Sequence, residues 1–139
     1  MKITKIKLLK YKEEDKKILN KFLSENKDAT KTFRYYDKRE YDVINNHIYT
    51  ALYFNNNNIL GYGHLDKEGD TVWLGIMVSD MYRGIGIGKK IISDLIKNYS
   101  GEITLSVDKK NNPAINLYKS KNFIKIEEND HIIIMKLKK

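Results

Sequence analysis

The sequence predicts an α/β domain in which a mixed sheet carries helices on both faces. Three observations predict this class. Short runs rich in β-branched and aromatic residues alternate with amphipathic stretches, in the order β-α-α-β-β-β-α-β-α-β-β. One strand enters a glycine-rich turn that leads directly into a helix. With 139 residues, 41% of them hydrophobic, the chain is long enough for a single domain, residues 1–139, with a sizeable core.

The first third of the chain is expected to hold a strand and two helices. Residues 2–9 alternate apolar and basic side chains, which indicates a strand. Residues 13–25 form an amphipathic pattern with acidic residues in the first turn, as a helix N-terminus favours. Residues 26–32 are a polar break, and a second helix is expected through residues 43–47.

A hairpin and a further strand follow. Residues 49–54 are expected to pair with residues 59–66 around a turn of four asparagines, a residue type that tolerates positive φ. A second turn at residues 67–70 separates this hairpin from the apolar run 72–78, which indicates the next strand.

The turn after this strand carries the strongest chemical signal. Residues 83–88 read Arg-Gly-Ile-Gly-Ile-Gly, and the apolar stripe of Ile91, Ile92, Leu95 and Ile96 indicates a helix directly after them. Three glycines in five residues remove the Cβ atoms that would hold a ligand away from the backbone. The unpaired N–H groups at a helix N-terminus favour an anion such as phosphate or diphosphate.

Three nucleotide-binding patterns compete for this turn. A Walker loop requires serine or threonine where the chain has Lys90, and a dinucleotide fingerprint requires a third glycine where Lys89 stands. The pattern Arg/Gln-x-x-Gly-x-Gly/Ala is satisfied by Arg83, Gly86 and Gly88. A tight connection that binds no ligand is the alternative.

The last third of the chain adds a strand, a helix and a closing hairpin. Residues 102–107 alternate and indicate a buried strand. The stretch 111–123 begins with Asn-Asn-Pro, which suits a helix N-terminus, and Asn122 suits a left-handed C-terminal cap. Residues 123–127 and 131–137 are expected to form the hairpin.

The glycine turn and the stretch 111–123 together resemble the GNAT superfamily of acyl-CoA-dependent N-acetyltransferases, over residues 61–123. The resemblance implies a central, mostly antiparallel sheet with helices on both faces, in which the strands before the two motifs splay apart. It also implies that the diphosphate of acetyl-CoA binds the glycine turn and that the pantetheine arm enters the cleft along the backbone of the preceding strand. Asn111 matches a coenzyme-binding position; the alternative is that it caps its helix and has no other role. The residues implied in coenzyme binding are Ile76, Met77, Val78, Arg83, Gly84, Ile85, Gly86, Ile87, Gly88, Lys89 and Asn111.

The activity implied by the resemblance is transfer of an acetyl group from acetyl-CoA to a primary amine, by direct attack in a ternary complex. Tyr118 matches the family's general acid, and a tyrosine with its usual pKa near 10 is protonated at neutral pH; a core tyrosine is the alternative. A backbone N–H near Val78 would stabilise the oxyanion. The base is less well defined, because Ser106 stands where some members carry a glutamate. His64 is the candidate base, with a water chain or Glu40 as alternatives.

The segment 33–41 falls where the family's substrate-specific region lies. It combines three tyrosines, a phenylalanine and two arginines. Arginine pairs with carboxylates or phosphates and aromatic rings stack on flat groups, so Phe33, Arg34, Tyr35 and Tyr36 are candidate substrate contacts. An anionic or nucleotide-linked small-molecule amine would suit them. Aromatic packing between two helix ends is the alternative.

Composition narrows the remaining functions. Acetylation of a protein or peptide amine and a non-catalytic acyl-CoA-binding module stay open.

The net charge of +8 favours anionic ligands, but the lysines are scattered, so we expect no nucleic-acid partner. The chain has no cysteine, and we expect no metal. No apolar run approaches membrane-spanning length and no leader is recognised, so we expect no membrane partner and a cytoplasmic location. Homodimers are common in the family, although no feature of this sequence fixes the oligomeric state.

Overall fold

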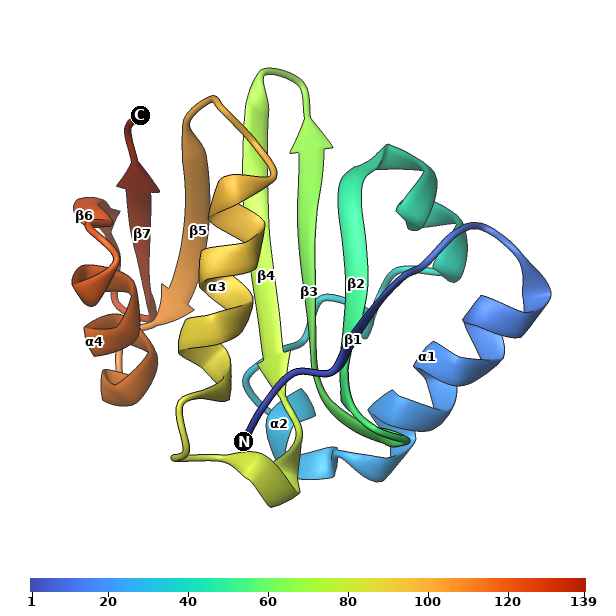
Figure 1. Ribbon diagram of the computed structural model, residues 1–139. Coiled ribbons are helices and arrows are strands. Elements are labelled where there is room, and N and C mark those ends of the chain that lie inside the picture. The colour runs from blue at the N-terminus through green and yellow to red at the C-terminus, as the bar shows by residue number, and fades with distance from the viewer.

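A computed structural model describes all 139 residues, Met1–Lys139. Its centre is a seven-stranded sheet with the order β1-β2-β3-β4-β5-β7-β6 (Figure 1). Every neighbouring pair is antiparallel except β4 and β5, which run parallel, so the predicted fold class is confirmed. The strands are β1 (Lys5–Leu8), β2 (His47–Asn55), β3 (Asn58–Glu68), β4 (Thr71–Val78), β5 (Ile103–Asp108), β6 (Ile124–Glu128) and β7 (Ile132–Leu137).

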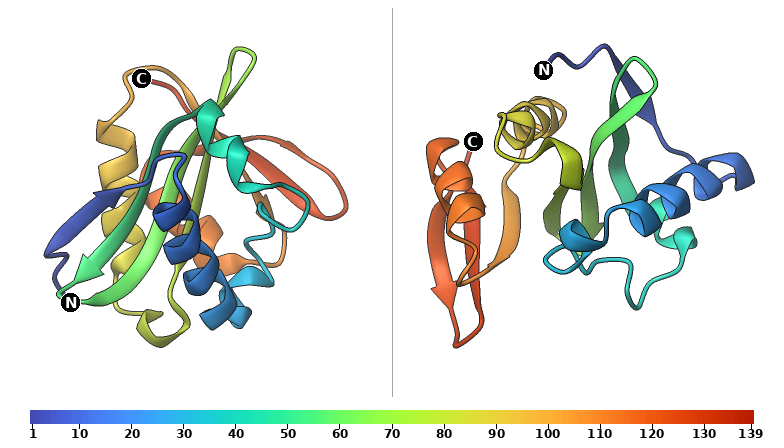
Figure 2. Two further views of the ribbon diagram at one scale, coloured as in Figure 1. Left: turned by 90° about the vertical axis from the view of Figure 1, so that its right-hand side faces the viewer. Right: turned by 90° about the horizontal axis from the view of Figure 1, so that it is seen from below.

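Helices cover both faces of the sheet, as expected. Helices α3 and α4 lie on one face, and α1 and α2 lie on the other (Figure 2). None of them is long and apolar enough to cross a lipid bilayer. The helices are α1 (Glu13–Glu25), α2 (Lys27–Thr30), α3 (Ile87–Lys97) and α4 (Asn112–Ser120), with short 3-10 turns η1 (Tyr41–Asn46) and η2 (Asp80–Tyr82).

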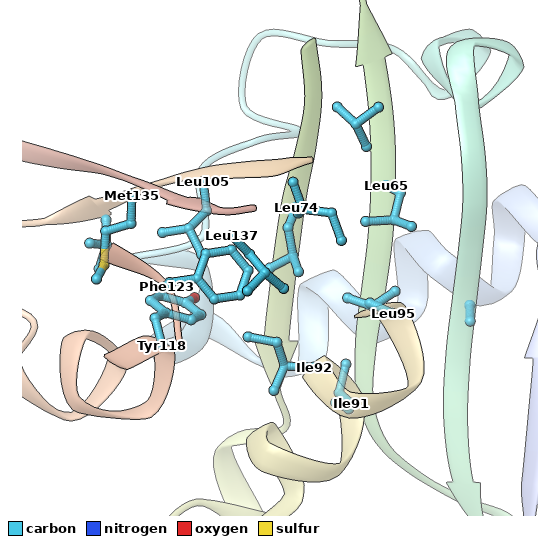
Figure 3. Packing of buried hydrophobic residues seen from close by; sticks show 14 of the residues in the cluster. Leu65, Leu74, Ile91, Ile92, Leu95, Leu105, Tyr118, Phe123, Met135 and Leu137 are labelled. Atoms are coloured by element: carbon cyan, nitrogen blue, oxygen red, sulfur yellow. The ribbon is translucent and has the colours of Figure 1, made fainter. Parts of the chain in front are cut away.

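Two hydrophobic clusters hold the helices to the sheet. On the α3 face, Ile91 and Leu95 point toward Leu65 and Leu74 of the sheet, while Tyr118 from α4 packs near Phe123 (Figure 3). On the opposite face, α1 contributes buried apolar side chains to a second cluster that also contains Tyr62 and Met77. The sheet therefore lies between two apolar layers, and burial of these side chains is the main stabilising term.

Three predicted elements differ from the structure. The first strand is shorter than predicted, Lys5–Leu8. The helix expected through residues 43–47 is the 3-10 turn η1, which ends at Asn46 because His47 already belongs to β2. The predicted polar break at residues 26–32 contains the helix α2. The carboxylate of Asp80 accepts hydrogen bonds from the first backbone amides of α2, so a residue distant in sequence stabilises this turn.

The strands β4 and β5 separate along most of their length. Only one residue pair, Trp73 with Thr104, joins them in the parallel ladder. Beyond this pair the two strands diverge toward their C-terminal ends, which lead into the glycine turn and into α4 respectively. The predicted splay is confirmed, and it places the two sequence motifs at the same end of the sheet.

Candidate active site

A cleft of about 420 Å³ lies where β4 and β5 diverge. Residues of β3, β4, β5 and α4 line it, and residues 32–35 and Arg39 of the segment before η1 line its other side. This volume falls in the range of small-molecule sites. The cleft is therefore the candidate binding site for small molecules.

Tyr118 lines the cleft from α4. Its side chain is 7% exposed, and its ring lies 6.0 Å from that of Phe123, centroid to centroid. The phenol makes no hydrogen bond within the chain, and burial alone raises the pKa of Tyr118 to about 12. The hydroxyl is therefore a protonated donor with no partner, which fits the general-acid role predicted for it.

The glycine turn presents open backbone. Gly84 and Gly86 have φ of +77° and +89°, and a Cβ atom built on either glycine would meet no atom within 4 Å. The N–H groups of residues 83–89 donate to no acceptor in the chain, and no side chain caps α3. Unpaired amides at a helix N-terminus form an anion site. Arg83 beside them lies 3.3 Å from the Asp80 carboxylate.

The turn adjoins the cleft without lining it. A Cβ atom on Gly88 would lie 3.1 Å from the Leu117 side chain and 3.7 Å from that of Ile76, which lines the cleft. The absence of a side chain at Gly88 thus allows α3, α4 and β4 to meet closely. The side chain of Met77 points the other way, into the cluster under α1, so only its backbone can face a ligand in the cleft. Asn111 lines the cleft and also caps α4, since its side chain accepts from the Ala114 amide at 3.3 Å.

His64 lines the cleft from the sheet face that carries α1, opposite to the face from which Tyr118 lines it. It is 2% exposed, and its Nδ1 lies 2.7 Å from the Tyr62 hydroxyl, which lies 2.6 Å from that of Tyr36. Burial, and the nearby His47, hold the pKa of His64 well below its usual value, so the ring is neutral. A Cβ atom on Gly75 would lie 2.5 Å from Nε2, so glycine is needed there for His64 to face the cleft.

A second hydrogen-bonded chain lies beside His64. The Tyr35 hydroxyl donates to Asp66 Oδ2 at 2.7 Å, because a carboxylate only accepts. The Tyr35 oxygen therefore accepts from His47 Nε2 at 2.8 Å. The Nδ1 of His47 then accepts from the Thr50 hydroxyl at 2.7 Å. Burial lowers the pKa of His47 to about 4, in agreement with this neutral tautomer.

The two arginines of the segment 33–41 are paired within the protein. Arg34 makes a bidentate contact with Asp108, at 3.2 and 3.0 Å, that spans the gap between the segment and β5. Arg39 stacks over the Tyr35 ring at 4.3 Å and lies 3.9 Å from the Glu68 carboxylate. Neither guanidinium is free to bind an anionic ligand without giving up a carboxylate partner.

The cleft thus gathers some of the predicted residues and leaves others outside. Tyr118, His64, Ile76, Asn111, Phe33, Arg34 and Tyr35 line it. Tyr36 does not line the cleft, and its hydroxyl contacts that of Tyr62. The alternative base Glu40 does not line it either and is exposed at the start of η1. No group of three or more histidine and carboxylate side chains could hold a metal.

Asp66, Trp73 and Asp108 are among the cleft residues to which sequence reasoning assigned no role. The alternation of residues 62, 64 and 66 along one strand was the available signal for Asp66, because such residues share a face.

The model of the acetyltransferase (GNAT) family matches residues 16–123. The chain belongs to this family. Solved structures with the same fold include an N-acetyltransferase from Staphylococcus aureus Mu50, at 19% identity and a TM-score of 0.73 over 96% of this chain and 97% of that one.

The fold is also shared by the GNAT domain of S. lividans PAT, at 11% identity and a TM-score of 0.76 over 96% of this chain and 89% of that one. Spermidine N-acetyltransferase from Vibrio cholerae, solved with CoA and spermine, matches at 16% identity and a TM-score of 0.69 over 96% of this chain and 95% of that one. No curated protein sequence matches the chain.

Proposed function

We propose that this member of the GNAT family is an acetyl-CoA-dependent N-acetyltransferase that acts on a small-molecule primary amine. One observation carries the proposal. A protonated phenol without a partner, Tyr118, and a neutral imidazole, His64, reach one cleft from opposite faces of the sheet. An acid on one side of a reacting thioester and a base on the other are what acetyl transfer to an amine requires.

The glycine turn fits the coenzyme. Its amides from residue 83 to residue 89 have no acceptor in the chain, and the two glycines with positive φ leave the backbone open to a diphosphate. The protein's positive charge of +8 also favours a ligand with several phosphates. Relatives of the same fold are solved with CoA, which supports the same choice. When bound, acetyl-CoA supplies the acetyl group as a thioester.

The transfer exchanges one bond for another. The lone pair of the amine nitrogen forms the new C–N bond, the C–S bond breaks, and its electron pair goes to sulfur. Tyr118 gives its proton to that sulfur. His64 Nε2 takes the proton of the amine. A backbone N–H near Val78 is the proposed donor to the carbonyl oxygen, whose charge increases during the attack.

The hydrogen bond of His64 leaves one ring nitrogen free to act as the base. With the Nδ1–H of the neutral ring donating to the Tyr62 hydroxyl at 2.7 Å, the lone pair stands on Nε2, which lies beside Gly75 in the cleft. Because burial lowers the pKa of His64, an imidazolium is costly at this position, so His64 returns the proton of the amine to water in the cleft after each transfer.

The geometry favours a small acceptor over a protein. The Arg34–Asp108 contact spans the acceptor side of the cleft, and the cleft volume of about 420 Å³ suits a small molecule. The anionic acceptor expected from the sequence depended on free arginines, and both are paired with carboxylates. A peptide acceptor is the second candidate, since the fold is shared with a ribosomal-protein-S18-alanine N-acetyltransferase from Escherichia coli.

Two measurements test the proposal. Saturating acetyl-CoA is expected to raise the melting temperature, since a ligand at 100 times its Kd stabilises by about 2.7 kcal/mol. Thiol release from acetyl-CoA is then measured with a panel of small amines, amino sugars and peptides, with the amine-free reaction as the control. Amine-dependent release from small amines supports the proposal. Stabilisation without release in any arm would indicate a binding module, and no stabilisation would remove the coenzyme site.

A further inference from the structure

We propose that Asp66 forms a binding site for a second ammonium group, so that the acceptor is a linear diamine or polyamine rather than a neutral or acidic amine. This inference rests on the proposed acetyltransferase function and names the substrate class of the same cleft.

The carboxylate of Asp66 is buried and half unpaired. The residue is 3% exposed, and its Oδ2 accepts from Tyr35. Its Oδ1 accepts no hydrogen bond from the chain, and no lysine or arginine pairs with it. Asp15 Oδ1 is the only fully buried side-chain oxygen or nitrogen without a hydrogen-bond partner, so Oδ1 of Asp66 is not fully closed off, and Asp66 lines the cleft. A buried carboxylate is costly unless a cation neutralises it.

The charges of the cleft leave Asp66 without a cationic partner. Three carboxylates line it, Asp66, Glu68 and Asp108, against two guanidinium groups. Arg34 contacts Asp108 and Arg39 lies nearest to Glu68, so the remaining negative charge belongs to Asp66. A negative pocket within a protein of net charge +8 does not follow from the overall composition. It is a local arrangement that favours a positively charged ligand.

The neighbours of Asp66 fix its position and complete the site. Tyr35, held by His47, orients the carboxylate through the hydrogen-bonded chain described above. Trp73 stands opposite Asp66 in the β3–β4 register and also lines the cleft. An indole ring offers an apolar surface to a methylene chain and a favourable face to an ammonium group.

The strand geometry sets the length of the acceptor. His64 stands opposite Gly75, and Asp66 stands opposite Trp73, two residues further along β3. Two residues of an antiparallel strand span about 7 Å, so an amine reacting beside His64 would place a group held by Asp66 roughly four or five carbon atoms away. A chain of this length bridges the two positions, and a shorter one leaves the second ammonium unpaired.

The test compares acceptors that differ only at the far end. Thiol release is measured with 1,5-diaminopentane, 5-aminopentan-1-ol and 5-aminopentanoate, for the wild type and Asp66→Asn. Asparagine keeps the volume and can still accept from Tyr35. Asp70→Asn, which removes one exposed carboxylate at the tip of the same hairpin, is the matched control. Binding of each acceptor to the CoA-saturated protein is measured by calorimetry, and melting curves verify that both variants fold.

The expected result is a diamine preference that depends on Asp66. The wild type should favour the diamine over the amino alcohol by about 10- to 100-fold in kcat/KM, the range for a hydrogen bond to a charged group. Asp66→Asn should lose this preference through the KM for the diamine, while Asp70→Asn should keep it. The proposal is overturned if the wild type binds the diamine no better than the amino alcohol, or if Asp66→Asn weakens all acceptors alike.

Failure of this inference can be told apart from failure of the proposed function. Acetylation of all three amines at similar rates would leave the acetyltransferase in place and remove the ammonium site. Tight diamine binding that Asp66→Asn abolishes, without thiol release in any arm, would keep the ammonium site and remove the catalytic proposal. If the protein folds but binds none of the acceptors, the ammonium site is removed as well. If Asp66→Asn fails to fold, the wild-type comparison of diamine and amino alcohol still decides the question.

Discussion

The exchange Tyr118→Phe separates the catalytic role of this residue from its structural role. The substitution deletes one hydroxyl that makes no hydrogen bond within the chain, and it keeps the ring that packs against Phe123. We therefore expect the free energy of unfolding to change by less than about 0.5 kcal/mol. Turnover should fall by about 100-fold or more, the range for loss of a general acid, while the KM for acetyl-CoA stays the same.

Tyr53→Phe is the matched control, because it deletes the same atom from a residue outside the cleft. Tyr53 is fully buried, and its hydroxyl donates to Asp94 at 2.7 Å. A hydrogen bond to a charged group contributes about 1.5–3 kcal/mol, which at this chain length lowers the melting temperature by roughly 5–15 °C. Turnover at a temperature where both proteins are folded should be unchanged. The two variants thus predict opposite outcomes for stability and activity.

The assay is thiol release under saturating acetyl-CoA, paired with thermal and urea unfolding of the same preparations. Unchanged turnover in Tyr118→Phe would refute the acid role. A large loss of stability in this variant would show that the hydroxyl has a partner in the fold. If the Tyr53→Phe control also lost turnover at a permissive temperature, the reasoning that separates the cleft from the core would be wrong.

Three further predictions concern the turn, the cleft floor and the buried histidines. Gly86→Ala should lower the melting temperature by a few degrees, because φ of +89° strains an L-residue by about 1–2 kcal/mol, and should raise the KM for acetyl-CoA about tenfold without changing the KM for the amine. Gly75→Ala should abolish amine turnover while acetyl-CoA still stabilises the protein, because the new Cβ would lie 2.5 Å from His64 Nε2; retained turnover would show that His64 is not confined there. Stability should be greatest above about pH 6.5 and fall as the pH approaches 4, because the folded pKa of His47, about 4, lies below its unfolded value and the unfolded chain binds the proton first. The loss, up to about 3 kcal/mol, is measured by urea unfolding at pH 7.5 and pH 4.5. It should be smaller in His47→Gln, and an equal loss in this variant would contradict the assignment.

Most of the fold could be predicted because its signals are local. The helix at residues 13–25 has the predicted bounds, since amphipathic spacing and acidic first-turn residues both lie within it. Asn122 has the left-handed conformation expected of a C-terminal cap, with φ of +71°. The helix α2 was missed because its stabilising partner, Asp80, lies 52 residues from Asp28 along the chain. Such a partner leaves no trace in the sequence near the helix.

The site could be predicted in part, for a related reason. The resemblance to a family indicated the glycine turn and Tyr118, and the structure places Tyr118 in the cleft. The charge of the acceptor pocket could not be predicted, because it depends on which carboxylate each arginine meets. Arg34 and Asp108 are 74 residues apart, and their contact turns an expected anion-binding group into part of the cleft wall.

The lone pairing of Trp73 with Thr104 has a consequence for the whole molecule. It divides the sheet into two halves, β1–β4 and β5–β7, whose backbones pair at a single position. Each further backbone hydrogen bond between the halves would contribute about 0.5–1.5 kcal/mol, but a complete ladder would close the cleft between them. The fold therefore gives up some stability to keep the cleft open, and a ligand whose own amides pair with both halves would restore part of that stability.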